Sequence, residues 1–305
     1  MVYELEDTSK AKGLFEGWQE TLITSCLQKV MGRIFVTDLS EPVSAFAFVG
    51  CFSFFAGKPD LELVKSKPEG FSLLTPQDRQ WEELIEATYP DAKKVTRYAI
   101  RKDTRFDIHT LERNLLLLPN GYELKIIDSA LYDKCLESPV TADFVSSFQS
   151  KAAYLRDGRG VVLVKNGEIV SGASSYTRYR EGIEIEVDTV EEERRKHLAL
   201  IACSALILRC LDEGLYPSWD AHSVQCRLAV LSGFFPAVLR LVFCRRTYRY
   251  DRRTCGTKDW HGQQARREAG YRRRFCVCRG MPVEAAAQPR RSVVVMDLDR
   301  SHCTD

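Results

Sequence analysis

Acidic and basic side chains with the potential for chemistry are concentrated between Glu181 and His222. The segment from Ile183 to Asp188 alternates apolar and acidic residues, so a strand there would bury one face and present three carboxylates on the other. Such a face lines a cleft or meets water, and carboxylates held on it could accept protons in acid–base chemistry. A solvated strand face without a chemical role is the alternative interpretation.

A basic loop, Arg194 to Ala199, follows the acidic strand and opens an apolar helix that Gly214 is expected to end. The free backbone N–H groups of a helix N-terminus, together with three cationic side chains, form an anion site suited to a pyrophosphate. Basic residues at a helix start are also common on solvated surfaces. A short strand, Leu215 to Asp220, is expected to return to the sheet.

The elements expected before this segment are a strand over 122–128, two short helices within 129–149 and two further strands. The last two strands, 160–165 and 168–176, flank Asn166-Gly167. This dipeptide is the strongest short hairpin signal, because both residues of the tight turn must take positive φ.

In this order of elements, the loop Arg194 to Ala199 resembles the pyrophosphate loop of the GNAT superfamily of acetyl-CoA-dependent N-acyltransferases, which has the pattern Arg/Gln-x-x-Gly-x-Gly/Ala. Arg194 and Ala199 match the pattern, and His197 stands where glycine is usual. The sequence resembles more narrowly a bacterial branch of two-part GNAT acetyltransferases. The resemblance implies an α+β fold, with a mixed GNAT-type sheet flanked by helices and preceded by a smaller α+β N-terminal domain.

The resemblance also implies roles for individual residues. The backbone of Val187 to Thr189 would bind the pantetheine and polarise the thioester carbonyl, and Glu184 or Glu186 would take the amine proton as catalytic base. Asp188 and Asp220 are weaker candidates for the base. The cofactor-binding residues implied are Val187, Asp188, Thr189, Arg194, Arg195, Lys196, His197, Leu198 and Ala199.

The function implied is direct transfer of an acetyl group from acetyl-CoA to an amine of a small molecule or peptide. The three carboxylates favour a cationic acceptor. Two alternatives stay open: a CoA-binding relative with impaired catalysis, and a nucleic-acid-binding protein that uses its Arg-rich tail.

The chain is expected to divide into an α+β domain over 1–120, a GNAT-like domain over 121–235 and an atypical tail over 236–305. Helical spacing in the first domain predicts helices over 13–28, 76–88 and 105–118, and Pro119-Asn120-Gly121 is the expected boundary. The apolar stretch 43–56 is too short to span a membrane, so buried structure and a cytoplasmic location are expected. The oligomeric state cannot be predicted.

The composition changes after residue 222. Residues 1–222 contain 13 Arg, 14 Lys and 35 acidic residues, whereas residues 223–305 contain 16 Arg, one Lys and seven acidic residues. We hypothesise that a reading-frame change near Ser223 replaced the native C-terminus, which resequencing of the gene would test. The tail cysteines lack the paired knuckles of a zinc site, so no metal is expected. Adventitious binding of nucleic acid by the basic tail is favoured over a selected role.

Overall fold

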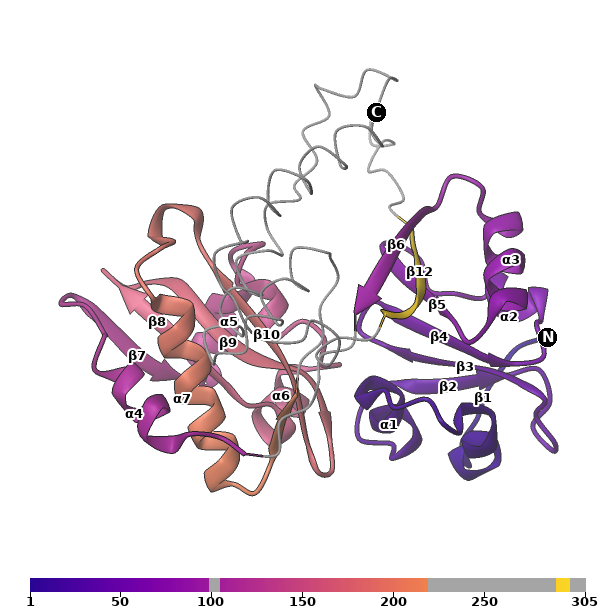
Figure 1. Cartoon of the computed structure of the whole chain (residues 1–305), viewed down its shortest axis with the longest axis horizontal. Helices are drawn as coiled ribbons and strands as arrows, with labels where there is room; N and C mark the ends of the chain where they lie inside the picture. Colours follow the sequence, from indigo (N-terminus) through magenta and orange to yellow (C-terminus); the bar gives the residue numbers. More distant parts are fainter. Residues whose placement is uncertain (99–104, 219–288, 297–305) are drawn as a thin grey trace, which may run out of the picture.

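The computed structural model describes residues 1–98, 105–218 and 289–296, which form two β-sheets lying side by side with helices packed against each (Figure 1). Both sheets mix parallel and antiparallel pairs, which confirms the predicted α+β class. Residues 99–104, 219–288 and 297–305 lie outside the described part, and so do Asp220 and the tail before residue 289.

The first sheet contains seven strands in the order β1-β2-β3-β4-β5-β12-β6. Its strands are β1 (Tyr3–Glu4), β2 (Arg33–Val36), β3 (Ser44–Val49), β4 (Phe52–Gly57), β5 (Ser72–Pro76), β6 (Lys93–Tyr98) and β12 (Pro289–Met296). Its helices are η1 (Thr8–Phe15), α1 (Thr21–Leu27), α2 (Leu61–Lys65) and α3 (Arg79–Thr88). The strand β12 comes from the atypical tail and pairs antiparallel with both β5 and β6.

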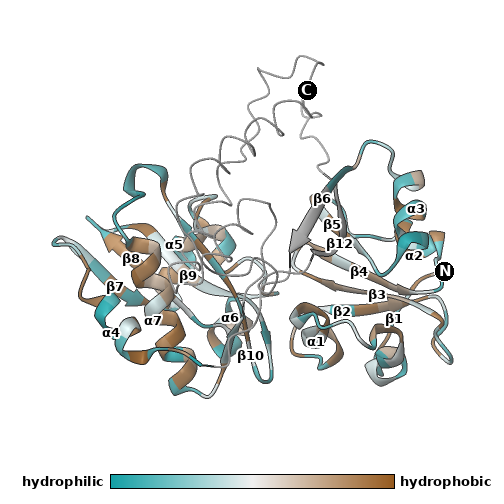
Figure 2. Cartoon of the chain, viewed as in Figure 1, coloured by the Kyte–Doolittle hydropathy of each residue, from teal (hydrophilic) through white to brown (hydrophobic). Residues whose placement is uncertain are grey.

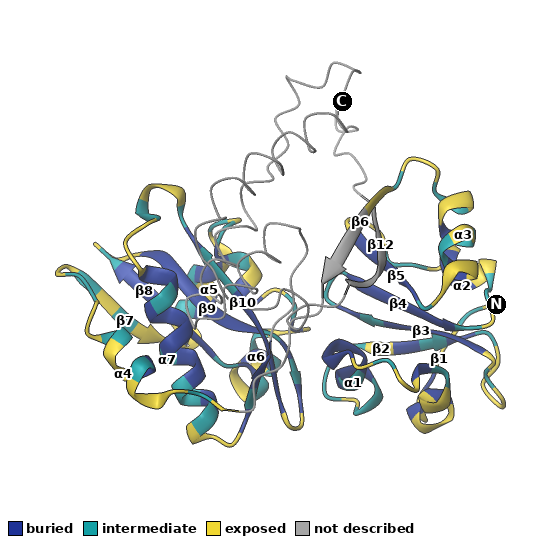
Figure 3. Ribbon diagram, in the orientation of Figure 1, coloured by how far each residue is buried: buried dark blue, intermediate teal, exposed yellow. Residues whose placement is uncertain are grey.

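The apolar stretch 43–56 forms the paired central strands β3 and β4, and helices cover both of their faces (Figure 3). Phe54 packs in one core with residues of η1 and α1, whereas Phe46 and Phe55 pack with Trp81 of α3 in another. A strand that is buried on both faces is apolar throughout instead of alternating. Among the described residues, no helix is long and apolar enough to cross a membrane.

The helix expected over 13–28 is interrupted, which corrects that prediction. A 3-10 helix ends at Phe15 and α1 begins at Thr21, because Gly17 between them takes the left-handed conformation with φ of +72°. The other two expected helices are present but shorter: α3, and α4 (Ile108–Leu115), which Asp107 caps. Leu111 of α4 packs in the core of the second sheet, and the domain boundary at residue 120 stays a prediction.

The second sheet has the strand order β11-β10-β9-β8-β7. Its strands are β7 (Tyr122–Ile126), β8 (Gly160–Lys165), β9 (Glu168–Tyr179), β10 (Gly182–Thr189) and β11 (Tyr216–Ser218). Its helices are α5 (Ser129–Leu136), η2 (Ala142–Phe144), α6 (Lys151–Asp157), η3 (Glu191–Glu193) and α7 (Leu198–Asp212). Asn166 and Gly167 turn between β8 and β9 with φ of 51° and 82°, which confirms the predicted hairpin.

Helix α7 is the central helix of this second half, and it is apolar over most of its surface (Figure 2). Ile201 and Leu206 pack with Ile183 and Ile185 of β10 in one core. Because α4 also packs on α7, the helix is covered on more than its sheet-facing side, which explains its broad hydrophobic surface.

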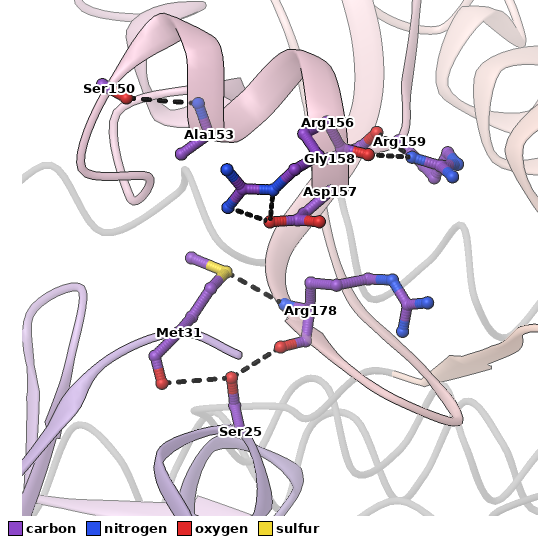
Figure 4. Close-up of polar contacts among 9 residues, drawn as sticks. All are labelled: Ser25, Met31, Ser150, Ala153, Arg156, Asp157, Gly158, Arg159 and Arg178. Atoms are coloured by element: carbon purple, nitrogen blue, oxygen red, sulfur yellow. Dashed lines mark hydrogen bonds and ion pairs between the residues drawn. The ribbon is translucent and has the colours of Figure 1, made fainter. Parts of the chain in front are cut away.

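We call the first sheet with its helices the first half of the structure, and the second sheet with its helices the second half. The two halves are joined where α1 contacts the end of β9 (Figure 4). The Ser25 hydroxyl donates to the Arg178 carbonyl at 2.5 Å, and the Arg178 N–H donates to Met31 Sδ at 3.2 Å. Further along β9, the Cys51 N–H donates to the Tyr176 hydroxyl at 2.9 Å. The first half therefore holds the strand that pairs with β10.

Candidate active site

The acidic residues of β10 lie on the sheet face opposite α7, as the alternation predicted. Ile183 and Ile185 pack with α7, while Glu184 and Glu186 are buried on the other face, at 5% and 7% exposure. Asp188 is half-buried. The two candidate bases therefore lie in the protein interior, which corrects the alternative of a solvated strand face for these two residues.

Glu184 is held by a residue of the first half. The hydroxyl of Thr21, at the start of α1, donates a hydrogen bond to Glu184 Oε2 at 2.6 Å. Both side chains are buried. Thr21 was not identified from the sequence, because it precedes Glu184 by 163 positions and no local pattern connects the two.

The basic loop adopts the backbone conformation expected where glycine is usual. His197 is the N-cap of α7 and has φ of 62°, and Arg195 is also left-handed, with φ of 65°. His197 makes no side-chain hydrogen bond to the helix, so its imidazole does not cap the first N–H groups. Left-handed residues in a turn direct successive N–H groups to one point, which is typical of backbone anion sites.

The cationic side chains of the loop differ in their surroundings. Arg195 is exposed, and Arg194 is half-buried with its Nε donating to the Thr189 carbonyl at 3.4 Å. Lys196 instead forms an ion pair with Glu193 at 2.6 Å. Lys196 shares the single carboxylate of Glu193 with Lys165, and the expectation that all three cations meet an anion stays a prediction.

Glu193 is the centre of a polar cluster that fixes this loop to the sheet. Lys165 of β8 forms an ion pair with it at 2.7 Å, and the Tyr122 hydroxyl of β7 donates to it as well. These hydrogen bonds, first that of Lys165 and then that of Lys196, lower the pKa of Glu193 to about 2. Sequence reasoning missed Glu193, although an acid directly before a basic loop was a signal available in the pattern.

The remaining expected cofactor residues are contributed by β10 and the start of α7. Val187 and Asp188 are half-buried, and the buried Thr189 shares a hydrogen bond of 2.8 Å with Ser171. Leu198 and Ala199 are buried, so only their backbone could meet a phosphate. The described pairing of β10 with β11 covers Gly182 to Glu184, which is the part of β10 before these residues.

No group of three or more His, Cys, Asp or Glu that could hold a metal ion occurs in residues 1–98, 105–218 and 289–296. The thiols of four cysteines are buried there: Cys26, Cys135, Cys203 and Cys210. Burial raises the pKa of each of these thiols to about 12, so none is poised as a nucleophile.

Comparisons with known proteins find a family and individual relatives that are similar to most of the chain. The family model described as GNAT acetyltransferase matches residues 12–231. The crystal structure of a GCN5-related N-acetyltransferase-like protein from Streptococcus suis is 41% identical in sequence, with 78% of this chain and 94% of that chain covered and a TM-score of 0.69. The protein named Uncharacterized N-acetyltransferase YdfB, from Bacillus subtilis, is 26% identical over 256 residues, covering 74% of this chain and 91% of that protein. The family match ends close to residue 223, where the composition changes.

Proposed function

The chain belongs to the GNAT acetyltransferase family, and we propose that it moves an acetyl group from acetyl-CoA directly to an amine of a small molecule or peptide. Its family makes it an acyl-CoA N-acyltransferase; the acetyl donor and the amine acceptor are the proposal. The observation that carries it is the backbone of the loop before α7, which is left-handed at both Arg195 and His197.

The loop has the properties that a pyrophosphate of acetyl-CoA requires. The N-terminus of α7 carries no side-chain cap and no acidic residue in its first turn, so its N–H groups and its dipole favour an anion. Arg195 is exposed and adds a positive charge. Glu191 and Glu192 are exposed before the loop, where solvent screens their charge, and Glu193 is neutralised by its two lysines.

The acceptor chemistry is assigned to β10. Acetyl-CoA supplies an activated thioester, so the protein must mainly hold the amine close to the carbonyl and remove its proton. Glu184 and Glu186 are the candidates for that proton transfer, because both carboxylates lie on the strand that leads to the loop Arg194 to Ala199. We call this loop the donor loop. Two buried carboxylates also favour a cationic acceptor, such as a polyamine or a peptide amine.

Donor binding is tested first, by thermal unfolding with and without acetyl-CoA. A ligand that binds only the folded state at 100 times its Kd stabilises it by about 2.7 kcal/mol. We expect a rise in Tm that is smaller in Arg195→Ala and unchanged in Arg156→Ala, since Arg156 pairs with Asp157 on α6. An absence of stabilisation at millimolar acetyl-CoA would refute the proposed donor.

Turnover is then tested by the release of CoA thiol from acetyl-CoA across a panel of amines. We expect release with at least one cationic amine and a strong loss in Glu184→Gln or Glu186→Gln. Stabilisation by acetyl-CoA without release from any amine would instead identify a CoA-binding relative with impaired catalysis. Salt-sensitive binding of nucleic acid to residues 223–305 alone would identify the third possibility, a nucleic-acid-binding tail.

A further inference from the structure

Glu184 lies in a row of polar side chains that crosses three strands. Its Cα partners are Thr177 on β9 and Ser218 on β11. Residues directly opposite on adjacent strands project from the same face of a sheet, with Cβ atoms about 5 Å apart. The exposure of these three side chains is 0% for Thr177, 5% for Glu184 and 3% for Ser218. One carboxylate is therefore flanked by two hydroxyls in the protein interior.

The orientation of this carboxylate is set from the first half of the chain. The Thr21 hydroxyl donates to Glu184 Oε2 at 2.6 Å, which is the length typical of an O–H donor to an ionised carboxylate. Thr21 begins α1, and α1 is itself bound to the end of β9 through Ser25. Both ends of the contact therefore lie on elements that are held by further bonds.

In the part of the chain that the structure describes, the hydroxyls of Thr177 and Ser218 lack the hydrogen bonds that buried polar groups usually make. Within the described part of the chain, neither Thr177 Oγ1 nor Ser218 Oγ has a hydrogen-bond partner. A buried hydroxyl without a partner destabilises a fold, and an apolar side chain of the same shape would avoid that loss. Each buried unsatisfied group needs an explanation, and a catalytic role is one of them; Ser53 and Thr75 of the first sheet also have hydroxyls without a partner in the described residues.

We infer that Thr21 is a positioning residue for the acyl transfer: its hydroxyl holds the Glu184 carboxylate in the orientation that accepts the amine proton, so the first half of the chain takes part in the acceptor chemistry. This inference rests on the proposed function. In the step itself the amine nitrogen bonds to the acetyl carbonyl carbon, the bond from that carbon to the CoA sulfur breaks, and CoA leaves as a thiolate that takes a proton from solvent. The amine loses one proton to Glu184, which becomes a neutral carboxyl group, and the Thr21 hydroxyl keeps its proton throughout. Thr177 and Ser218 supply further hydroxyls beside the same carboxylate.

Other titratable groups lie on the elements packed around Glu184. They are Glu186 and Asp188 on its own strand, Glu168, Tyr176, Arg178 and Tyr179 on β9, Tyr216 on β11, Cys26 on α1 and Glu20 before α1. Burial and then the charge of Glu184 raise the pKa of Tyr179, so that phenol stays protonated at neutral pH. The phenol of Tyr179 therefore does not contribute to the acidic limb of a pH–rate profile. A substitution at Thr21 acts on Glu184, the carboxylate to which its hydroxyl donates.

The test compares three variants of the full chain: Thr21→Val, Thr21→Ser and Ser25→Ala. Thr21→Val removes the donor at constant shape, Thr21→Ser keeps it, and Ser25→Ala removes another bond of the same helix to β9. We expect Thr21→Val to lower kcat about 10- to 100-fold, with little change in KM for acetyl-CoA and with the acidic limb moved to higher pH. Thr21→Ser and Ser25→Ala are expected to keep the wild-type limb and most of kcat.

A double-mutant cycle with Glu184→Gln shows whether Thr21 acts through Glu184. We expect Thr21→Val to cause no further loss of kcat in the Glu184→Gln background. Additive losses, or equal effects of Thr21→Val and Ser25→Ala, would overturn the inference. If circular dichroism shows that Thr21→Val does not fold, Thr21→Ala replaces it, and Glu184→Gln must by itself remove the acidic limb.

The failure of the inference is distinguishable from the failure of the proposed function. If acetyl-CoA neither stabilises the wild-type chain nor loses its acetyl group to any amine, the proposed function is wrong. If the wild-type chain is active and Glu184→Gln is equally active, the proposed function stands and the role of Thr21 is wrong.

Discussion

Replacing Glu193 by Gln removes the negative charge on which Lys165 and Lys196 converge, and it tests whether this cluster fixes the donor loop. Glutamine keeps the size of the side chain, and its amide oxygen can still accept the hydrogen bond from the Tyr122 hydroxyl. The pKa of Glu193 is lowered from its ordinary 4.5 to about 2, which corresponds to at most about 3 kcal/mol at about 1.36 kcal/mol per pH unit. Lys165 and Lys196 are 33% and 40% exposed, so solvent screening reduces the expected loss to roughly 1–2 kcal/mol at pH 7.

The pH dependence follows from the direction of the shift. A carboxyl group with a lowered pKa in the folded state contributes its full stability above pH 4.5 and loses it as the pH falls toward 2. We therefore expect the difference in unfolding free energy between wild type and Glu193→Gln to be constant from pH 7 to about 5. It should shrink at lower pH.

Urea denaturation across this pH range measures the difference, and Glu168→Gln is the matched control. Glu168 is 73% exposed and pairs with Lys134 at 3.1 Å, so its replacement should cost at most about 0.5 kcal/mol. Equal losses in the two variants at pH 7 would refute the reasoning. A Glu193→Gln effect that did not change with pH would refute it as well.

Two further predictions concern backbone conformation. His197→Gly should raise the unfolding free energy by roughly 0.5–1 kcal/mol in thermal unfolding and keep the stabilisation by acetyl-CoA, because glycine takes φ of 62° without strain. Gly50→Ala should cost about 2–3 kcal/mol in urea denaturation, since its φ is +59° and the added Cβ would lie 2.1 Å from the Tyr176 hydroxyl. Gly70→Ala is its control, with φ of +83° but no atom within 4 Å of the added Cβ, and equal losses in the two would contradict the clash.

Elements whose signals are local could be predicted from the sequence. The Asn166-Gly167 turn, the alternation along β10 and the apolar helix α7 each depend on neighbouring residues, and the structure has all three. The helix expected over 13–28 was wrong in part, because Gly17 turns the chain where helical spacing alone continues. Propensity and spacing did not reveal which conformation that glycine takes.

Long-range pairing could not be predicted. Nothing local in the sequence showed that β12 would pair with β5 and β6, more than 190 positions earlier. The contact of Thr21 with Glu184 was invisible for the same reason. The left-handed conformation of His197 was not predicted either, because histidine stands there in place of the usual glycine.

The donor loop and the candidate base are held by different parts of the chain, and this separation has a measurable consequence. Glu193 is bound by Tyr122 and Lys165, both from the second sheet, whereas Glu184 is bound by Thr21 from the first half. A change at Glu193 should therefore alter the stabilisation by acetyl-CoA and leave the acidic limb of the pH–rate profile in place. Thr21→Val should move the acidic limb and leave the stabilisation by acetyl-CoA unchanged. If either variant changed both quantities together, the two sites would form one coupled unit, and the first half would be needed for donor binding as well as for the acceptor chemistry.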